Sequence, residues 1–149
     1  MFAICLDPPF TSQRLYHAPL GSKAAHASFD DTWSMSDFAA EWAELQQAAD
    51  TSLHHTVLGA GLTAGESMQA YLTFMAQRFI ELHRVLKPTG SLYLHCDDNA
   101  SQCLKQLLDA VFGTARFENE IIWQREIGTK NSAKRYPRNY RPAVLLRQV

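Results

Sequence analysis

Short apolar runs alternate along the chain with longer stretches in which apolar residues recur every three or four positions. Three of the runs predict buried strands: AICL at Ala3–Leu6, SLYLHC at Ser91–Cys96 and NEIIWQR at Asn119–Arg125. A fourth run, PAVLLRQV, closes the chain and is a candidate last strand.

Helical periodicity is strongest over Glu66–Leu86, which the breakers Pro88 and Gly90 follow. The predicted buried stripe of this helix consists of Met68, Leu72, Met75, Phe79, Leu82 and Leu86. A second helix is predicted over residues 100–112, and a third within SMSDFAAEWAELQQAAD, with Ser36 as its N-cap. The segments between these elements, Thr11–Thr32 and Thr51–Gly65, are predicted to be loops.

The order of the elements predicts an α/β fold with a largely parallel sheet and crossover helices. The 149 residues suit a single domain. Acids follow two of the predicted strands, Asp7 after the first and Asp97 after the second. Because parallel strands have their carboxyl ends at one edge of the sheet, these acids are expected to face one cleft.

Composition places the chain among ordinary globular proteins, with 46% hydrophobic residues, 19% charged residues and a net charge of -1. No stretch approaches the ~20 apolar residues of a membrane span, and the N-terminus lacks the features of a signal peptide. Cys5, Cys96 and Cys103 form no CxxC pair, which favours reduced thiols and a cytoplasmic location. The histidines show no metal-ligand spacing, so no metal site is predicted.

The charge is uneven, because the tail from Arg125 onward is basic and carries a single acid, Glu126. A solvated end and a surface that faces DNA phosphates both fit this pattern. The candidate DNA-binding residues are Arg125, Lys130, Lys134, Arg135 and Arg138.

The first predicted strand ends in the sequence DPPF, Asp7 to Phe10. Two consecutive prolines cannot continue a strand, because neither has an N–H to donate. They are expected to hold a stiff elbow that presents a carboxylate, backbone carbonyls and an aromatic ring at the strand's carboxyl end. Two acceptors beside an aromatic ring suit the exocyclic amine of a nucleobase taken out of its stack.

DPPF resembles the catalytic motif of the amino-group DNA methyltransferases, which methylate adenine N6 or cytosine N4 with S-adenosylmethionine. The resemblance extends over roughly residues 4–138, in the blocks APLGSKAA, YLTFMAQRFIELHRVLKPTGSLYLHCDD, LKQLLDAVFG and FENEIIWQR. These blocks look like the restriction-modification methylases in which the catalytic motif precedes the cofactor-binding motif. The resemblance implies a Rossmann-like methyltransferase sheet and S-adenosylmethionine as the cofactor.

The resemblance also implies roles for individual residues. Asp7 and the Pro8 carbonyl would accept hydrogen bonds from the target amine, Pro9 would keep the elbow rigid, and Phe10 would stack on the flipped base. Asp97 and Asp98 are the candidates for lining the same cleft, although the family often has proline at the second position. Cytosine-N4 enzymes more often begin the motif with serine, so Asp7 favours adenine.

In this order of motifs the family places a target-recognition region and an F-x-G-x-G cofactor loop further toward the C-terminus, and the chain contains neither. Residues 1–149 are therefore expected to form one partial catalytic domain, and no residues are assigned to binding S-adenosylmethionine. Residues 126–149 form a basic tail that departs from the family, which suggests a truncated or frameshifted gene product. The partners implied are DNA, a complementary methylase fragment or a second copy, and a restriction subunit.

Three alternatives stay open. An inactive fragment could bind only DNA or a partner methylase half. A related elbow that begins with Asn occurs in methyltransferases acting on glutamine amides of proteins, but the downstream blocks disfavour this class. The glycines of Gly59–Gly65 suggest a nucleotide-binding loop, but their spacing does not match GxGxxG and a flexible loop is favoured.

Overall fold

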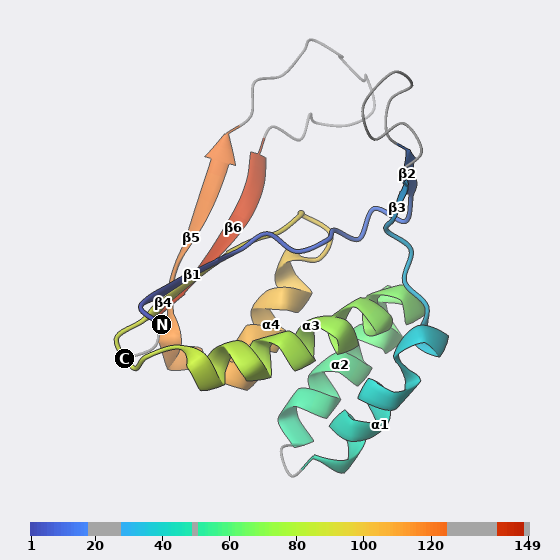
Figure 1. Cartoon of the computed structure of the whole chain (residues 1–149), viewed down its shortest axis with the longest axis horizontal. Helices are drawn as coiled ribbons and strands as arrows, with labels where there is room; N and C mark the ends of the chain where they lie inside the picture. Colours follow the sequence, from blue (N-terminus) through green and yellow to red (C-terminus); the bar gives the residue numbers. More distant parts are fainter. Residues whose placement is uncertain (18–27, 49–50, 125–139, 148–149) are drawn as a thin grey trace.

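The computed structural model describes residues 1–17, 28–48, 51–124 and 140–147. Its main sheet has four strands in the order β1-β4-β6-β5. The strands are β1 (Ala3–Leu6), β4 (Ser91–His95), β6 (Tyr140–Arg147) and β5 (Phe117–Gln124). The helices lie on one side of this sheet (Figure 1), which gives an α/β arrangement, as predicted.

The sheet was predicted to be largely parallel, but it contains both parallel and antiparallel pairs. β1 and β4 pair in parallel, with Leu6 opposite Leu94, whereas β6 lies antiparallel between β4 and β5. β1, β4 and β5 therefore run in one direction and β6 runs against them. The reversal follows from connectivity, because β6 comes next after β5 with no described helix between them, and a strand that returns without a crossover pairs antiparallel.

The predicted loop at Thr51–Gly65 is wrong, because Thr51–Ala64 forms helix α2. Leu53, Val57 and Ala60 are buried along its inner face at helical spacing. The glycines obscured this periodicity, and Gly61 lies against the Gln69 side chain of the next helix, which a Cβ there would displace. The structure therefore has a packed helix at the position where a flexible loop was predicted, and it does not have the nucleotide-binding loop considered as an alternative.

The other helices are close to the predicted ones. They are the 3-10 helix η1 (Met35–Phe38), α1 (Ala39–Gln47), α3 (Glu66–Val85), α4 (Ser101–Phe112) and the 3-10 helix η2 (Thr114–Arg116). The N-cap at η1 is Ser34 rather than the predicted Ser36, because the Ser34 side chain accepts a hydrogen bond from the Ser36 N–H at 3.4 Å. A small antiparallel ribbon, β2 (Leu15–His17) with β3 (Ser28–Asp30), lies within the predicted first loop.

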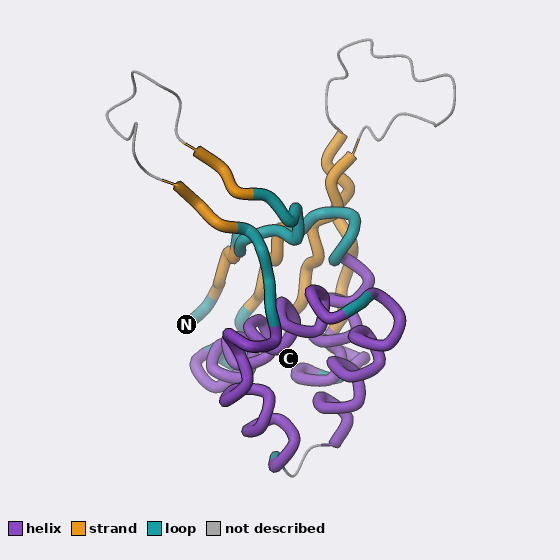
Figure 2. Tube along the Cα trace, turned by 90° about the vertical axis from the view of Figure 1, so that its right-hand side faces the viewer, coloured by secondary structure: helices purple, strands orange, loops and turns teal. Residues whose placement is uncertain are grey.

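The core lies between the sheet and the helices. Ile4, Leu92 and Leu94 point inward from β1 and β4 onto α3 and α4, and the stripe of α3 is buried except for the half-buried Leu82. Figure 2 shows the helices gathered beneath the strands, with the β2–β3 ribbon and the β5–β6 pair extending away from them on opposite sides. The alternate residues Cys5 and Tyr93 are exposed on the other face of the sheet.

Candidate active site

The parallel pairing of β1 and β4 brings their two acidic ends together, as predicted. Leu6 lies opposite Leu94, so Asp7, the first residue after β1, comes beside His95, the last residue of β4. The His95 Nδ1 atom lies 2.8 Å from Asp7 Oδ1. The Asp7 side chain keeps 70% of its surface exposed, so the carboxylate stands at the open edge of the sheet.

The elbow itself is anchored by its prolines and carries an aromatic ring. Pro8 is buried, while Pro9 and Phe10 are half-buried. The Phe10 ring meets the His95 ring edge-on, with centroids 5.4 Å apart and an interplanar angle of 83°. Asp7, Phe10 and His95 therefore form one contiguous group at the carboxyl ends of two neighbouring strands.

Asp97 ties this elbow to the start of α4. Its Oδ2 atom accepts hydrogen bonds from the Thr11 N–H at 3.4 Å and the Thr11 hydroxyl at 3.2 Å, and its Oδ1 atom accepts from the Ala100 N–H at 2.9 Å. The carboxylate thus satisfies a backbone donor at the N-terminal end of α4 and holds the residue after Phe10. Asp98, the second cleft candidate, is half-buried, and its backbone carbonyl accepts from the Ser101 hydroxyl at 3.5 Å.

A buried carboxylate that sequence reasoning did not single out holds the other end of the elbow. Asp31 is 1% exposed, and its Oδ2 atom accepts hydrogen bonds from the Ser12 N–H at 2.8 Å and from the Ser12 hydroxyl. The Trp33 indole N–H lies between two acceptors, the Phe10 carbonyl at 3.2 Å and Asp31 Oδ1 at 3.4 Å. The sequence signal for Asp31 was its place in a predicted loop, two positions before Trp33.

His95 was also missed, because it was counted among histidines without metal spacing. The signal was its place, since it ends the apolar run SLYLHC and comes shortly before Asp97 and Asp98. A polar side chain at the carboxyl end of a parallel strand belongs to the edge where ligands bind. The two missed residues show that the elbow depends on partners from two distant segments, one around Asp31 and one at the end of β4.

The backbone just after the elbow is in an uncommon conformation. Gln13 has a φ of 54°, the left-handed region that non-glycine residues seldom adopt. Its side-chain amide donates a hydrogen bond to the Ser67 hydroxyl at the start of α3. Strained residues of this kind persist where the surrounding contacts determine them, and they cluster at functional sites.

Two ionisable side chains near Asp97 have pKa values that burial raises further above neutral pH. Burial, reinforced by the charges of Asp97 and Glu120, raises the pKa of the Cys96 thiol to about 12. Burial also raises the pKa of Tyr71, with the nearby charges of Asp97, Cys96 and Asp31 acting in the same direction. Cys96, just after β4, and Tyr71 of α3 both belong to the buried core.

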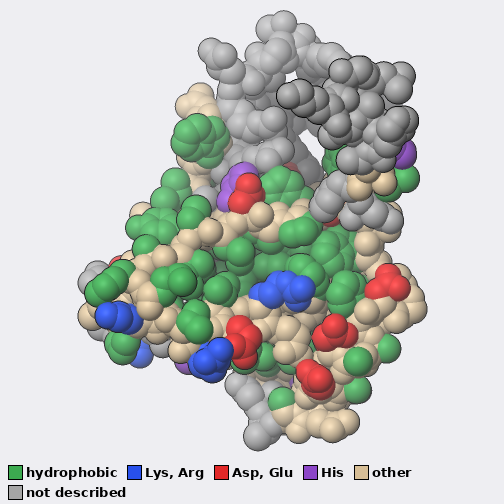
Figure 3. All heavy atoms as spheres, viewed as in Figure 1, with side chains coloured by type: hydrophobic (Ala, Val, Ile, Leu, Met, Phe, Trp, Pro, Cys, Tyr) green, Lys and Arg blue, Asp and Glu red, His purple; other side chains and the backbone are tan. Residues whose placement is uncertain are grey.

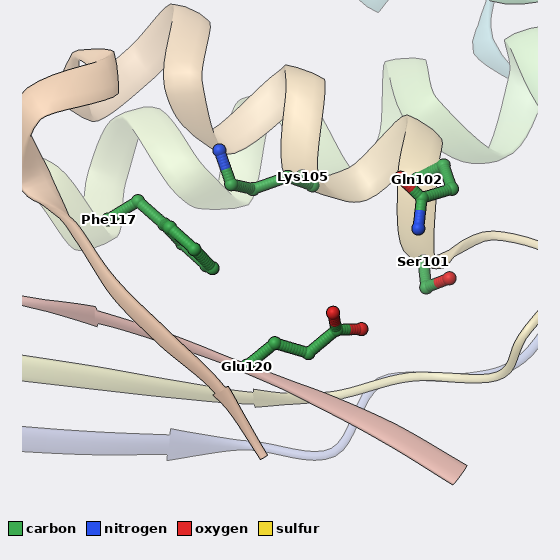
Figure 4. A pocket seen from close by; sticks show the side chains of 5 residues that line it. All are labelled: Ser101, Gln102, Lys105, Phe117 and Glu120. Carbon is green, nitrogen blue, oxygen red and sulfur yellow. The ribbon is translucent and has the colours of Figure 1, made fainter. Parts of the chain in front are cut away.

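A cavity of about 190 Å³ lies between α4 and β5, away from the elbow. Figure 4 shows the side chains of Ser101, Gln102, Lys105, Phe117 and Glu120 around it. The Lys105 ammonium is 2.6 Å from Asp109 Oδ2 and 4.2 Å from the centre of the Phe117 ring. The one lysine of the cavity is thus engaged with its own helix and with β5.

The residues predicted to bind DNA, Arg125, Lys130, Lys134, Arg135 and Arg138, lie outside the described residues. Within the described ranges, no three His, Cys, Asp or Glu side chains gather as a metal would require. None of the described helices has the length and apolar character needed to cross a membrane.

The two cleft candidates beside the elbow do not by themselves make a site for S-adenosylmethionine, the group that the family implies. Such a site needs acceptors for an ammonium group and for ribose hydroxyls. Of the two cleft candidates, Asp97 is already bonded to Thr11 and Ala100, and Asp98 lies in the turn that precedes α4.

Comparison with known proteins agrees with this geometry. Over 65 residues, 44% of this chain and 14% of the relative, the sequence is 42% identical to the type II methyltransferase M.EcaI of Enterobacter cloacae. Over 131 residues, 87% of this chain and 18% of the relative, it is 26% identical to the Mod subunit of the type III restriction-modification enzyme StyLTI of Salmonella typhimurium. The chain spans less than a fifth of the length of these two relatives.

A family model described as DNA methylase, of the N6/N4 group, matches residues 2–147, almost the whole chain. The match includes β1, the elbow and every strand of the main sheet. The chain therefore belongs to the N6/N4 DNA methylase family.

Proposed function

We propose that the chain is the catalytic part of a DNA methyltransferase that places a methyl group on the exocyclic amine of a flipped base, adenine N6 in particular. The observation that carries the proposal is the Asp7–Phe10 elbow, where an exposed carboxylate and an aromatic ring leave the sheet together. S-adenosylmethionine, the donor that the family implies, would supply an electrophilic methyl carbon.

The elbow suits the acceptor side of this chemistry. An amine attached to an aromatic ring is a poor nucleophile, because its lone pair is delocalised into the ring. Hydrogen bonds from both of its protons to Asp7 and to the Pro8 carbonyl would hold the nitrogen and favour the positive charge that develops on it during transfer. Phe10, half-buried beside Asp7, provides a surface on which an unstacked base can lie.

Adenine is the proposed target because the motif begins with an acid, whereas cytosine-N4 enzymes more often begin it with serine. A cytoplasmic location, a DNA partner and association with a restriction subunit belong to the same proposal, and the similarity to a restriction-modification Mod subunit supports them. Basic residues of the tail, Arg125 to Arg138, are proposed to contact the DNA backbone.

The test is transfer of a labelled methyl group from S-adenosylmethionine to unmethylated DNA by the purified chain. Digestion of the product to nucleosides should yield N6-methyladenine, whereas N4-methylcytosine would overturn the adenine assignment. Asp7→Ala should lower transfer by about 100-fold or more, since positioned groups of this kind contribute about 10²- to 10⁴-fold. Because Asp7 is mostly exposed, the variant should melt within about 2 °C of the parent.

A second candidate function is a non-catalytic piece that binds DNA or a partner methylase half. It is favoured by the sheet face opposite the helices, where Cys5, Tyr93, Ile121 and Trp123 are exposed, and by β1, which pairs only with β4 among the described strands. Parallel strands are usually covered on both faces, so such a face suits a packing partner. Binding of S-adenosylmethionine separates the two candidates, since the non-catalytic piece would bind none.

A further inference from the structure

We infer that His95 is a positioning residue for Asp7, and that it sets the rotamer in which one carboxylate oxygen is presented to the methyl acceptor. The inference rests on the proposed function for its catalytic meaning, and on geometry for the pairing. His95 Nδ1 and Asp7 Oδ1 are 2.8 Å apart, and the Phe10 ring lies edge-on to the same imidazole.

The direction of this hydrogen bond follows from the chemistry of the two groups. An ionised carboxylate has acceptors only, so the imidazole nitrogen that faces it must carry the proton. His95 therefore donates its Nδ1–H to Asp7 Oδ1, and the contact fixes the ring tautomer or accompanies a fully protonated ring. In either form, Oδ1 is occupied by His95 and Oδ2 is the oxygen left for an incoming amine.

The strand register makes the contact a property of the fold. Leu6 and Leu94 are paired neighbours in a parallel ladder, and the next residues are Asp7, the first after β1, and His95, the last of β4. Both backbones are thus fixed by the sheet immediately before the site. Without the histidine, a carboxylate with 70% of its surface exposed would be expected to sample several χ1 rotamers.

His95 also connects the two chemical parts of the elbow. It donates to the carboxylate that would accept a hydrogen bond from the amine, and its ring contacts the aromatic side chain that would stack on the base. A single side chain that contacts both can set their separation. A misplacement of about 1 Å is enough to cost about 100-fold in rate for a reaction that depends on alignment.

The alternative is an incidental surface pair, which would contribute little to stability or geometry. The side chains of His95 and Asp7 are 36% and 70% exposed, and ion pairs between exposed side chains contribute little to stability. Stability measurements alone would therefore not distinguish the two views. The rotamer of Asp7 does distinguish them, and it can be measured without catalysis.

The first experiment measures the χ1 populations of Asp7 by three-bond couplings to Cγ in the labelled full chain, in the parent, His95→Asn and His95→Leu. The asparagine amide can occupy the place of Nδ1–H and donate, whereas leucine cannot. We expect one rotamer in the parent and in His95→Asn, and averaging in His95→Leu. Asp37, an exposed aspartate at the start of η1, is the matched control and should not change.

Averaging at Asp7 in the parent, or a single rotamer in His95→Leu, would overturn the inference whatever the catalytic result. The second experiment measures kcat and KM for methyl transfer to DNA. We expect His95→Leu to lose about 10- to 100-fold in kcat with little change in the KM for DNA, and His95→Asn to recover most of it. If the parent is active and His95→Leu is equally active, the inference about His95 is also overturned. If the parent is inactive, the result counts against the proposed function, and the rotamer measurement alone decides whether His95 positions Asp7.

Discussion

Trp33 donates its indole N–H to the backbone carbonyl of Phe10 over 3.2 Å, and so joins the elbow to the helical layer. The same ring packs against Tyr71 and Phe74 of α3, with centroids 5.0 and 4.9 Å away. Figure 3 shows hydrophobic side chains gathered across the middle of this face of the molecule. The position of Phe10 is therefore set from the core as well as from the strand.

Trp33→Phe should weaken the connection between the elbow and α3 while keeping an aromatic ring at this position. Phenylalanine keeps an aromatic ring near Tyr71 and Phe74 but loses the donor to Phe10 and Asp31, which is worth about 1 kcal/mol, with a further loss from its smaller ring. Trp33→Ala should cost about 3–5 kcal/mol, because it removes the ring as well. Urea unfolding of both variants tests this order. Unchanged stability in Trp33→Phe would show that the hydrogen bond contributes nothing, and equal losses in the two variants would show that the retained ring contributes nothing.

Asp31→Ala should destabilise the chain although it removes a charge from the interior. The Ser12 N–H and hydroxyl and the Trp33 indole would lose their acceptor in a site that is almost closed to water, at about 1–3 kcal/mol for the unsatisfied donors. Glu81→Ala is the matched control, since its pair with Arg84 is exposed and should change stability by less than about 0.5 kcal/mol. Equal unfolding midpoints for the two variants would contradict the role of Asp31.

The three cysteines should differ in reactivity. Cys5 is exposed, Cys103 is half-buried with a pKa raised by burial, and Cys96 is buried with a pKa of about 12. Because the thiolate is the reactive form, iodoacetamide at pH 8 should modify Cys5 first and leave Cys96 unmodified in the folded chain. Mass spectrometry of the adducts gives the order, with a denatured sample as the control in which all three react.

Alkaline pH should lower the free energy of unfolding through Cys96. Below its ordinary pKa of 9.0 the thiol is protonated in both states and the stability is fully present. As pH rises from about 9 toward 12, the unfolded thiol ionises while the folded one does not, so stability falls by up to about 1.4 kcal/mol per pH unit. Cys96→Ala should show a shallower decline over this range, and an unchanged slope would contradict the assignment.

The exposed face of the sheet should promote association. Trp123→Glu is expected to reduce self-association with little change in stability, because the side chain is 69% exposed. Leu62→Glu is the matched control, since Leu62 is 80% exposed but lies on α2. Sedimentation at several concentrations measures the effect, and a monomer at all concentrations in the parent would remove the case for a second copy on this face.

Local patterns predicted most of the elements, because burial on one side leaves a periodic trace. Ala3–Leu6 is a strand with the predicted bounds, and α3 ends one residue before the predicted Leu86. Helix α2 was missed because its glycines and threonines obscured the spacing of Leu53, Val57 and Ala60. The antiparallel β6 could not be predicted either, since strand order depends on long-range pairing.

The site divides in the same way. The parallel strands predicted that Asp7 and Asp97 lie at the same edge of the sheet. Hydrogen bonds from Thr11 to Asp97 connect the end of the elbow to the segment that follows β4. The sequence offered weak signals for Asp31 and His95, but the contacts that Asp31, Trp33 and His95 make were not predictable from local pattern, because each partner is brought in from a distant segment by the fold. A single acid or histidine in a sequence gives no indication of the side chain that it will meet.

Methyl transfer from labelled S-adenosylmethionine to unmethylated DNA tests the central claim most directly, with the parent chain and Asp7→Ala compared at equal folded concentration. The account predicts label on adenine N6 with the parent and about 100-fold less or none with Asp7→Ala. Transfer that survives the loss of Asp7 would contradict the catalytic role of the elbow. A parent that transfers nothing and binds no S-adenosylmethionine would contradict the proposed activity and favour the non-catalytic binding piece.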